Sequence, residues 1–167
     1  LTPGQQLERI NEEADQLVAA QQRAWLDLAA LLAEEGLEVV AAVSLEQEER
    51  DWLRTYLGEQ IFPVLTPQAV DPSHPFPFVP HLGYALVFSM VDPADGERVS
   101  EVLMIPASVP RFLRLPGKTL RFVSIDDAIA ANLHLIFPGF ELIGAGAFRV
   151  LRDTDIEIEE DAEDLVR

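Results

Sequence analysis

Four basic residues lie close together in the chain and are its best candidates for binding an anion. Arg111 and Arg114 are three residues apart, and Lys118 and Arg121 follow shortly after them. Guanidinium and ammonium groups donate charge-assisted hydrogen bonds to phosphate oxygens, so the four could face one row of phosphates. Two plainer interpretations stay open: the four lie on a solvated face of a sheet, or they pair with the chain's own carboxylates.

The other residue types that perform chemistry do not form a recognisable catalytic or metal site. The histidines are His74, His81 and His134, and they lack the spacing that places two zinc ligands on one helix. The chain has no cysteine, which excludes thiolate nucleophiles, disulfides and Cys-ligated metals. No glycine motif for phosphates or dinucleotides occurs. The residues alone therefore predict an interaction or regulatory module without a self-contained active site.

Residues 153–164 form an acidic stretch with eight carboxylates and no base. Aligned as an EF-hand loop, the stretch has Ile158 in place of the turn glycine and Asp164 in place of the bidentate glutamate, so we reject a calcium site. The alternation of acids with isoleucines predicts a charged strand edge that discourages pairing. A loose Mg²⁺ site is the alternative.

The composition restricts the classes of partner. The net charge of −17 argues against general binding to nucleic acid or to anionic membranes, since both need a basic surface. The chain has 167 residues, of which 49% are apolar, and can therefore bury the core of one domain, with or without an appendage. The longest apolar-leaning run, residues 122–137, is interrupted by polar and charged residues, whereas a membrane span needs about 20 apolar ones.

A long helix is predicted at the N-terminus. Thr2 is its N-cap, Gln5 stands at the capping-box position, and Gly36 ends it. Apolar residues at spacings of three and four, among them Leu17 and Trp25, form a stripe along about 50 Å of helix. The short helix that follows cannot cover this length. We expect other helices of a longer chain, or a second copy, to cover Leu17 and Trp25; the alternative is a plain surface helix.

Residues 61–80, the proline-rich segment, hold half of the chain's twelve prolines. Proline restricts the backbone and lacks an N–H donor, so this segment should separate a helical part from a sheet part. The helix before it is predicted to be capped by Ser44. Its apolar content is too high for a solvated linker, so we predict that Phe76 and Phe78 are buried against this domain or a partner chain.

After the proline-rich segment the pattern changes to strands. Residues 82–91 are apolar on both faces and predict a strand covered on both sides, followed by a turn at 92–96 and a return strand at 99–105. A further strand at 120–124 leads into a helix capped by Ser124. Residues 140–152 predict a last strand, in which Gly144 and Gly146 indicate either a bulge or a close crossing. The predicted fold is α+β: a long N-terminal helix, then a mixed, largely antiparallel β-sheet packed with helices.

Four motifs of this chain, in the same order and with similar spacing, resemble those of bacterial polyphosphate kinase, which builds polyphosphate from ATP. The resemblance covers essentially the whole chain. Its motifs are Trp52-Leu53 with Tyr56 and Ile61-Phe-Pro-Val-Leu-Thr-Pro67; Pro75-Phe-Pro-Phe78; Ile105-Pro106 with Val109-Pro-Arg-Phe112 and Leu115-Pro116; and Phe148-Arg-Val150 with Arg152-Asp-Thr-Asp155.

The resemblance implies that residues 1–36 are the last long helix of an N-terminal helical domain. Residues 37–167 would be the middle, or head, domain, cut at its C-terminal end. The family transfers the γ-phosphate of ATP to polyphosphate through a phosphohistidine, with Mg²⁺. That histidine belongs to C-terminal domains of phospholipase D-like fold, so no catalytic, cofactor-binding or metal-binding residue is assigned here, and this segment alone should be inactive.

For the middle domain the resemblance implies dimer contacts and a wall of the polyphosphate tunnel. Arg111, which lies in the matching Val-Pro-Arg-Phe motif, is the first residue to examine for polyphosphate contact. The expected partners are the remaining domains of the same polypeptide, a second copy of the parent and polyphosphate, in the cytoplasm or at the periphery of the inner membrane. The alternative from another class is a free-standing, non-enzymatic protein-interaction module.

Overall fold

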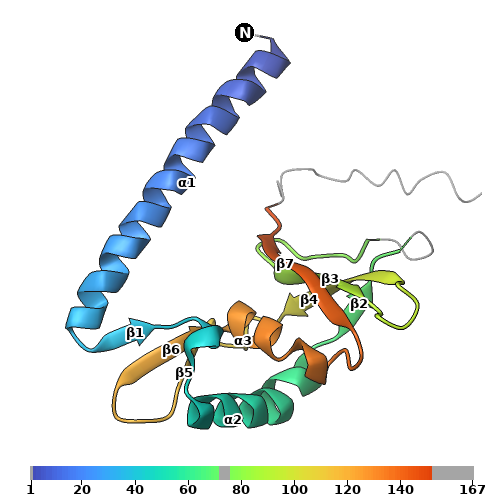
Figure 1. Ribbon diagram of the computed structural model, residues 1–167. Coiled ribbons are helices and arrows are strands. Elements are labelled where there is room, and N and C mark those ends of the chain that lie inside the picture. The colour runs from blue at the N-terminus through green and yellow to red at the C-terminus, as the bar shows by residue number, and fades with distance from the viewer. Residues whose placement is uncertain (1, 72–75, 152–167) are drawn as a thin grey trace, which may run out of the picture. The chain divides into compact units, whose positions relative to one another are not determined.

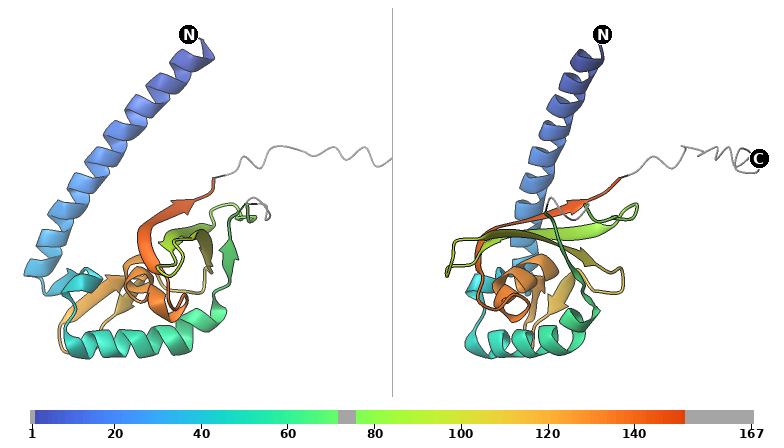
Figure 2. Two further views of the ribbon diagram at one scale, coloured as in Figure 1. Left: turned by 45° about the vertical axis from the view of Figure 1, so that its right-hand side comes forward. Right: turned by 90° about the vertical axis from the view of Figure 1, so that its right-hand side faces the viewer.

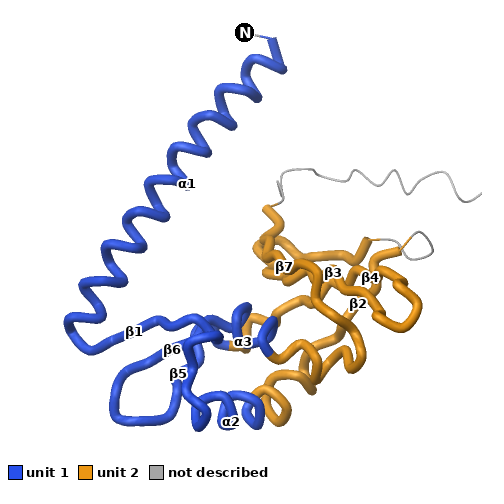
Figure 3. The backbone as a smooth tube through the Cα atoms, viewed as in Figure 1, with its two compact units in different colours: residues 1–56, 110–131 blue, residues 57–109, 132–167 orange. Residues whose placement is uncertain are grey.

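The computed structural model describes residues 2–71 and 76–151 of the protein. They fall into two compact units: the described residues of 1–56 with 110–131, and those of 57–109 with 132–151 (Figure 3). Each unit contains its own β-sheet. The α+β class predicted from the sequence is confirmed, with the strands divided between two sheets.

Helix α1 (Pro3–Glu34) has the predicted capping box at its start (Figure 1). The Thr2 hydroxyl oxygen accepts a hydrogen bond from the Gln5 N–H, and the Gln5 side chain accepts one from the Thr2 N–H at 2.9 Å. At the other end Gly36 adopts a φ of +78°, which favours glycine and ends the helix. No residue of α1 is buried.

The sheet of the first unit has the order β1-β6-β5. Strand β6 lies in the middle; it pairs in parallel with β1 and antiparallel with β5. Strand β5 lies at the edge, in a segment between Pro110 and Pro116. The elements are β1 (Leu37–Val39), a 3₁₀ turn (Ala42–Ser44), α2 (Gln47–Tyr56), β5 (Phe112–Arg114), β6 (Leu120–Ser124) and α3 (Ile125–Ala131).

The predicted cap of α2 is wrong. Ser44 lies in the 3₁₀ turn, where its hydroxyl donates to the carbonyl oxygen of Ala41 at 2.7 Å and is therefore engaged locally. Glu46 precedes the helix instead, and its N–H donates to the Glu49 carboxylate at 2.8 Å. By contrast, Ser124 caps α3 as predicted, because its hydroxyl oxygen accepts from the Asp127 N–H at 3.3 Å.

The second unit contains an antiparallel sheet with the order β2-β4-β3-β7. The hairpin of β3 and β4 is confirmed, and Gly96 supplies its positive φ of +78° in the turn. The elements are a π-helical turn (Leu57–Ile61), a 3₁₀ turn (Phe62–Val64), β2 (Pro67–Ala69), β3 (Tyr84–Val91), β4 (Arg98–Ile105), a 3₁₀ turn (Leu133–Leu135) and β7 (Glu141–Arg149).

Strand β7 carries the predicted bulge. Its pairing with β3 shifts between Ser89, which lies opposite Gly144, and Met90, which lies opposite Leu142, so Ile143 is the extra residue. A Cβ atom on Gly146 would lie 3.4 Å from the Val87 side chain, which is an ordinary van der Waals contact, so β7 and β3 do not approach closely enough here to require glycine.

The core of the second unit lies on one face of strand β3. Leu86, Phe88 and Met90 point to this face and are almost completely buried. On the other face Ala85 is buried too, but Val87 and Ser89 are only half-buried. The predicted burial of both faces is therefore met more closely on the core face than on the other.

The proline-rich segment is packed in part. Ile61, Leu65 and Val79 are buried. Phe76 and Phe78 are 61% and 69% exposed, so the prediction that this domain buries them is wrong. The Phe76 ring lies 6.2 Å from that of Phe148, on an open edge strand that offers little cover. Burial of Phe76 and Phe78 against a partner chain stays a prediction.

Residues 72–75, with His74, and residues 152–167, with the whole acidic stretch, lie outside the described residues. The predictions of a charged strand edge and of a Mg²⁺ site in the acidic stretch are therefore untested. Within residues 2–71 and 76–151, no helix combines the length and the apolar character needed to cross a bilayer.

Candidate functional site

Two of the four predicted basic residues, Arg114 and Arg121, point to opposite faces of the first sheet. Arg114 of β5 lies directly opposite Phe122 of β6. Residues opposite each other point to the same face, and neighbours along a strand point to opposite faces. Arg121 precedes Phe122 and therefore faces the other side of the sheet from Arg114. The four cations cannot all face one row of phosphates from this sheet.

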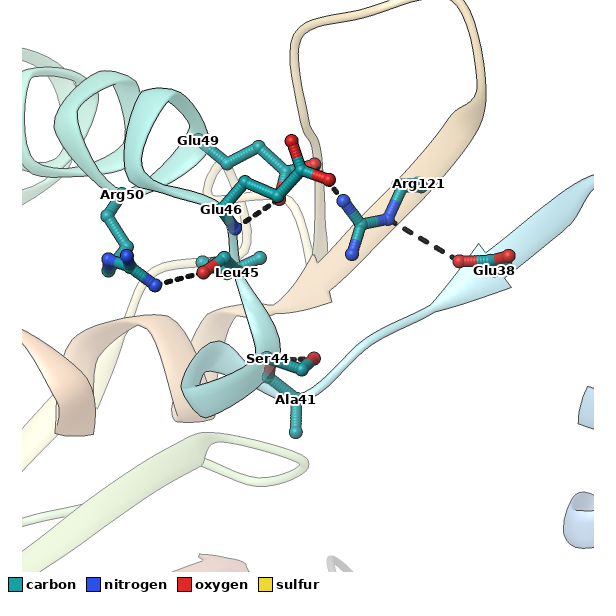
Figure 4. Close-up of polar contacts among 8 residues, drawn as sticks. All are labelled: Glu38, Ala41, Ser44, Leu45, Glu46, Glu49, Arg50 and Arg121. Carbon is teal, nitrogen blue, oxygen red and sulfur yellow. Dashed lines mark hydrogen bonds and ion pairs between the residues drawn. The ribbon is translucent and has the colours of Figure 1, made fainter.

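Arg121 pairs with the chain's own carboxylates (Figure 4). Its Nη1 donates to Oε1 of Glu49 on α2, and its Nε lies 3.4 Å from Oε2 of Glu38 on the neighbouring strand β1. The side chains of Arg121 and Glu49 are only 17% and 8% exposed. Of the interpretations left open by the sequence, pairing with the protein's own acids therefore holds for Arg121.

The Glu49 carboxylate is satisfied from two sides. One oxygen accepts from Arg121 and the other from the N–H of Glu46 at the start of α2. A buried charge needs such partners, and the positive end of a helix dipole further favours a carboxylate in the first turn. This pair joins α2 to β6, and its role is structural.

A small cavity of about 170 Å³ opens beside this ion pair. Its size would admit a few water molecules. Carboxylates outnumber cations in the lining, and the one arginine is already paired, so the lining does not match an anion. The lining residues are Glu46, Glu48, Glu49, Pro116, Gly117, Thr119 and Arg121.

Arg114 and Lys118 remain as exposed cations of the predicted cluster. Within residues 2–71 and 76–151, neither forms an ion pair with a carboxylate. Lys118 lies in the loop between β5 and β6, while Arg111 is half-buried just before β5, where its carbonyl oxygen accepts from the Ile125 N–H at 2.9 Å. The first unit thus offers two solvent-facing cations on one hairpin.

Apolar side chains share the sheet face of Arg114. Phe112 is two residues from Arg114 on β5, and Leu120 is two residues from Phe122 on β6, so both point to the sheet face of Arg114. Phe112 is 49% exposed and Leu120 is 41% exposed. An exposed face that combines a guanidinium with apolar rings can bind a partner or a polyanion, but it holds no pair of groups for proton or group transfer. This face is a candidate binding surface.

In the second unit, burial raises the pKa of the Glu101 carboxyl above its ordinary value of 4.5, and the nearby Asp71 carboxylate raises it further. Glu101 lies in β4 directly opposite Phe88, on the core side of the sheet. Sequence reasoning missed this residue, although an acid within the apolar run 99–105 is a visible signal. We assign Glu101 a structural role.

The stripe of helix α1 is exposed. Leu17 and Trp25, predicted to lie in an interface, are 67% and 41% exposed in this chain. The other strongly exposed apolar residues of the helix are Leu7, Ile10, Val18, Leu26, Leu28 and Leu31. This arrangement leaves the stripe accessible, and contact with a partner stays a prediction.

Among the described residues, no group of three or more His, Cys, Asp or Glu side chains could hold a metal ion.

Comparison with known proteins shows one consistent similarity. The family described as the polyphosphate kinase middle domain matches residues 48–167. The polyphosphate kinase of Erythrobacter litoralis is 43% identical over 166 residues, which are 99% of this chain and 23% of that protein. That of Mycobacterium bovis BCG is 43% identical over 182 residues, covering 100% of this chain and 24% of that protein.

A solved structure shows the same fold. The crystal structure of polyphosphate kinase from Porphyromonas gingivalis superimposes with a TM-score of 0.81 at 25% sequence identity. The alignment covers 91% of this chain and 24% of that one. This chain therefore spans about a quarter of the length of the relatives it matches.

Proposed function

Because the chain belongs to the polyphosphate kinase family, we propose that it is a non-catalytic assembly segment of an enzyme that transfers the γ-phosphate of ATP to polyphosphate. The observation that carries this proposal is helix α1, which has no buried residue along its 32 residues although it carries an apolar stripe. Such a stripe needs a covering partner. Remaining domains of the same polypeptide are the proposed cover.

The proposed division places residues 1–36 in the helical domain and residues 37–167 in the middle domain. The phosphohistidine, ATP and Mg²⁺ of the reaction belong to other domains in this proposal. The described residues lack a metal-binding group of carboxylates or histidines, so we assign no Mg²⁺-dependent step to them. The parent enzyme would act as a cytoplasmic homodimer.

We further propose that the hairpin of β5 and β6 contributes to the wall of a polyphosphate tunnel. The support is the exposure of Arg114 and Lys118 on this hairpin, next to half-buried Arg111. Arg121 has no part in this contact, because its guanidinium binds Glu49 and Glu38. The proposed surface is therefore narrower than the full basic cluster.

Two measurements test the assembly role. Incubated with [γ-³²P]ATP, Mg²⁺ and short polyphosphate, the chain should form no phosphohistidine and elongate no polyphosphate. Co-expressed with the remaining domains of the Erythrobacter litoralis relative, it should co-purify with them through α1. Leu17→Glu should abolish co-purification, because it places a charge in the stripe. Ala19→Glu adds the same charge on the opposite, polar side of the helix, where its neighbours three and four residues away are all polar, and should leave co-purification unchanged.

Formation of ³²P-labelled phosphohistidine on the isolated chain would contradict the proposal that this segment is not catalytic. Equal recovery of the Leu17→Glu variant and the Ala19→Glu control would contradict the docking of the stripe. Recovery of neither variant nor the wild-type chain would favour the other class of function, a free-standing interaction module.

A further inference from the structure

The two faces of the sheet in the first unit differ in cover. Helix α2, drawn in teal, lies on the face to which Arg121 points (Figure 2). On that face Leu113 and Val123 are buried. The residues of the opposite face are all exposed or half-buried, and we call it the aromatic face. Its residues are Leu37, Val39, Phe112, Arg114, Leu120 and Phe122.

The strand register brings two aromatic rings and a guanidinium together on the aromatic face. Arg114 of β5 lies directly opposite Phe122 of β6, and Phe112 is two residues from Arg114 along β5. Phe112 and Phe122 are therefore diagonal neighbours. Diagonal neighbours on two antiparallel strands are about 7–8 Å apart, which is within reach of aromatic and long side chains. The two rings and the guanidinium can thus contact one ligand.

A second cation follows at one end of this group. Lys118 is exposed in the loop that joins β5 to β6, and Arg114 lies between Phe112 and this loop along the chain. Among the described residues, neither cation forms an ion pair with a carboxylate. The aromatic face therefore places its more exposed ring, Phe112, at one end of the hairpin and a cation at the other.

We propose that the aromatic face binds a nucleoside di- or triphosphate. The base stacks on the rings of Phe112 and Phe122. Arg114 and Lys118 hold the phosphates. Aromatic side chains on an open sheet stack with the flat face of any nucleobase, and arginine and lysine form charge-assisted hydrogen bonds with phosphate oxygens. The face offers both kinds of contact, and this combination matches the two ends of a nucleotide.

The charges of the chain favour a small ligand over a nucleic-acid strand. A long polyanion needs a broad basic surface, whereas this chain has a net charge of −17 and the hairpin presents two exposed cations. Two cations suit the few phosphates of one nucleotide. An apolar protein segment fits the face less well, because it would bury Arg114 beside Phe122 without a phosphate or carboxylate to pair with it.

This site rests on the proposed function in one respect, because the proposed contact with polyphosphate uses the same two cations. No step of phosphoryl transfer is assigned to it, and the ATP of that reaction belongs to other domains in the proposed function. A nucleotide and polyphosphate should therefore compete for Arg114 and Lys118. The rings distinguish the two ligands, since polyphosphate has no base to stack on Phe112.

Titration of the ¹⁵N-labelled chain with ADP, and separately with tripolyphosphate, tests the site by NMR. ADP should shift the backbone amide signals of β5, β6 and the loop between them. Phe112→Leu keeps an apolar side chain but removes the ring, so it should weaken ADP binding about tenfold and leave tripolyphosphate binding unchanged. Phe76→Leu is the matched control: it makes the same change at an exposed ring of the second unit and should affect neither ligand.

Replacing both Arg114 and Lys118 by Gln should weaken both ligands, and tripolyphosphate should displace ADP from the wild-type chain. Unchanged amide signals of the second unit verify that each variant is folded. Equal ADP affinity of the wild-type and Phe112→Leu chains, or ADP shifts outside the first sheet, would overturn the nucleotide site. Binding of tripolyphosphate without ADP would do the same, would leave the polyphosphate contact intact and would favour a protein segment on the aromatic face. If neither ligand binds, both proposals fail.

Discussion

Glu49 and Arg121 join helix α2 to strand β6 through an ion pair that is largely removed from solvent. Removing one partner of a buried pair leaves the other charge uncompensated. Arg121→Met should therefore lower the free energy of unfolding by about 3 kcal/mol. Urea denaturation of the chain measures this loss as a shift in the midpoint at constant slope.

Two further variants distinguish the loss of stability caused by breaking the ion pair from a general effect of removing an arginine. Glu49→Leu together with Arg121→Met leaves no buried charge and should recover all but about 1 kcal/mol, the hydrogen bond to the Glu46 N–H. Arg114→Met removes an exposed guanidinium from the other sheet face and should change stability by less than about 0.5 kcal/mol. An equal loss in both arginine variants would contradict the structural role of Arg121.

The local features of this chain were predictable, and its long-range pairings were not. The capping box of Thr2 and Gln5, the hairpin turn at Gly96 and the bulge in β7 each depend on a few neighbouring residues. The predicted Ser44 cap was wrong because the Ser44 hydroxyl donates to the Ala41 carbonyl oxygen inside a 3₁₀ turn. A capping pattern in the sequence does not distinguish a hydroxyl that accepts from a helix N–H from one that donates to a nearby carbonyl.

The pairing of β1 with β6 joins residues 37 and 120, and no periodicity in either segment specifies that partner. The separation of Arg114 from Arg121 depends on the register between two strands, which sequence spacing does not contain. For this reason the sequence predicted the residues of the basic cluster, while the structure decides which of them reach solvent. The exposure of Phe76 and Phe78 likewise depends on cover that composition does not reveal.

Asp127 connects α3 to the 3₁₀ turn near β1. Its carboxylate accepts a hydrogen bond of 2.5 Å from the N–H of Ala42, a residue that is 5% exposed. Asp127→Ala leaves this buried donor unsatisfied and should cost about 1–3 kcal/mol of stability. Asp127→Asn keeps an acceptor oxygen and should lose less than Asp127→Ala in urea denaturation. Equal losses would show that the hydrogen bond to Ala42 is not the cause.

Glu101 should make the stability of the chain depend on pH. Its folded-state pKa is raised above 4.5, first by burial and then by Asp71, so the folded chain favours the protonated carboxyl. The stability from this group is fully present below pH 4.5 and is lost as the pH rises through the folded pKa. Glu101→Gln should therefore unfold at higher urea concentration than the wild-type chain at pH 7, with the difference vanishing below pH 4.5.

Exposed Glu97 in the β3–β4 turn provides the control for the loss of one negative charge. Glu97→Gln should not reproduce the pH-dependent difference, since its side chain is not on the core face of the sheet. Parallel stability curves for the Glu101→Gln and wild-type chains between pH 4 and pH 8 would contradict the effect of burial on Glu101.

Polyphosphate binding should depend on the exposed cations of the β5–β6 hairpin and not on Arg121. Contacts between cations and phosphates release counterions, so affinity falls as salt rises, with a slope that reports the number of contacts. Replacing both Arg114 and Lys118 by Gln should weaken binding and reduce the slope by about 2, one for each lost contact. Arg121→Gln should leave the slope unchanged, because its guanidinium binds Glu49 and Glu38. If the double variant and the wild-type chain give the same salt dependence, the hairpin does not contact polyphosphate.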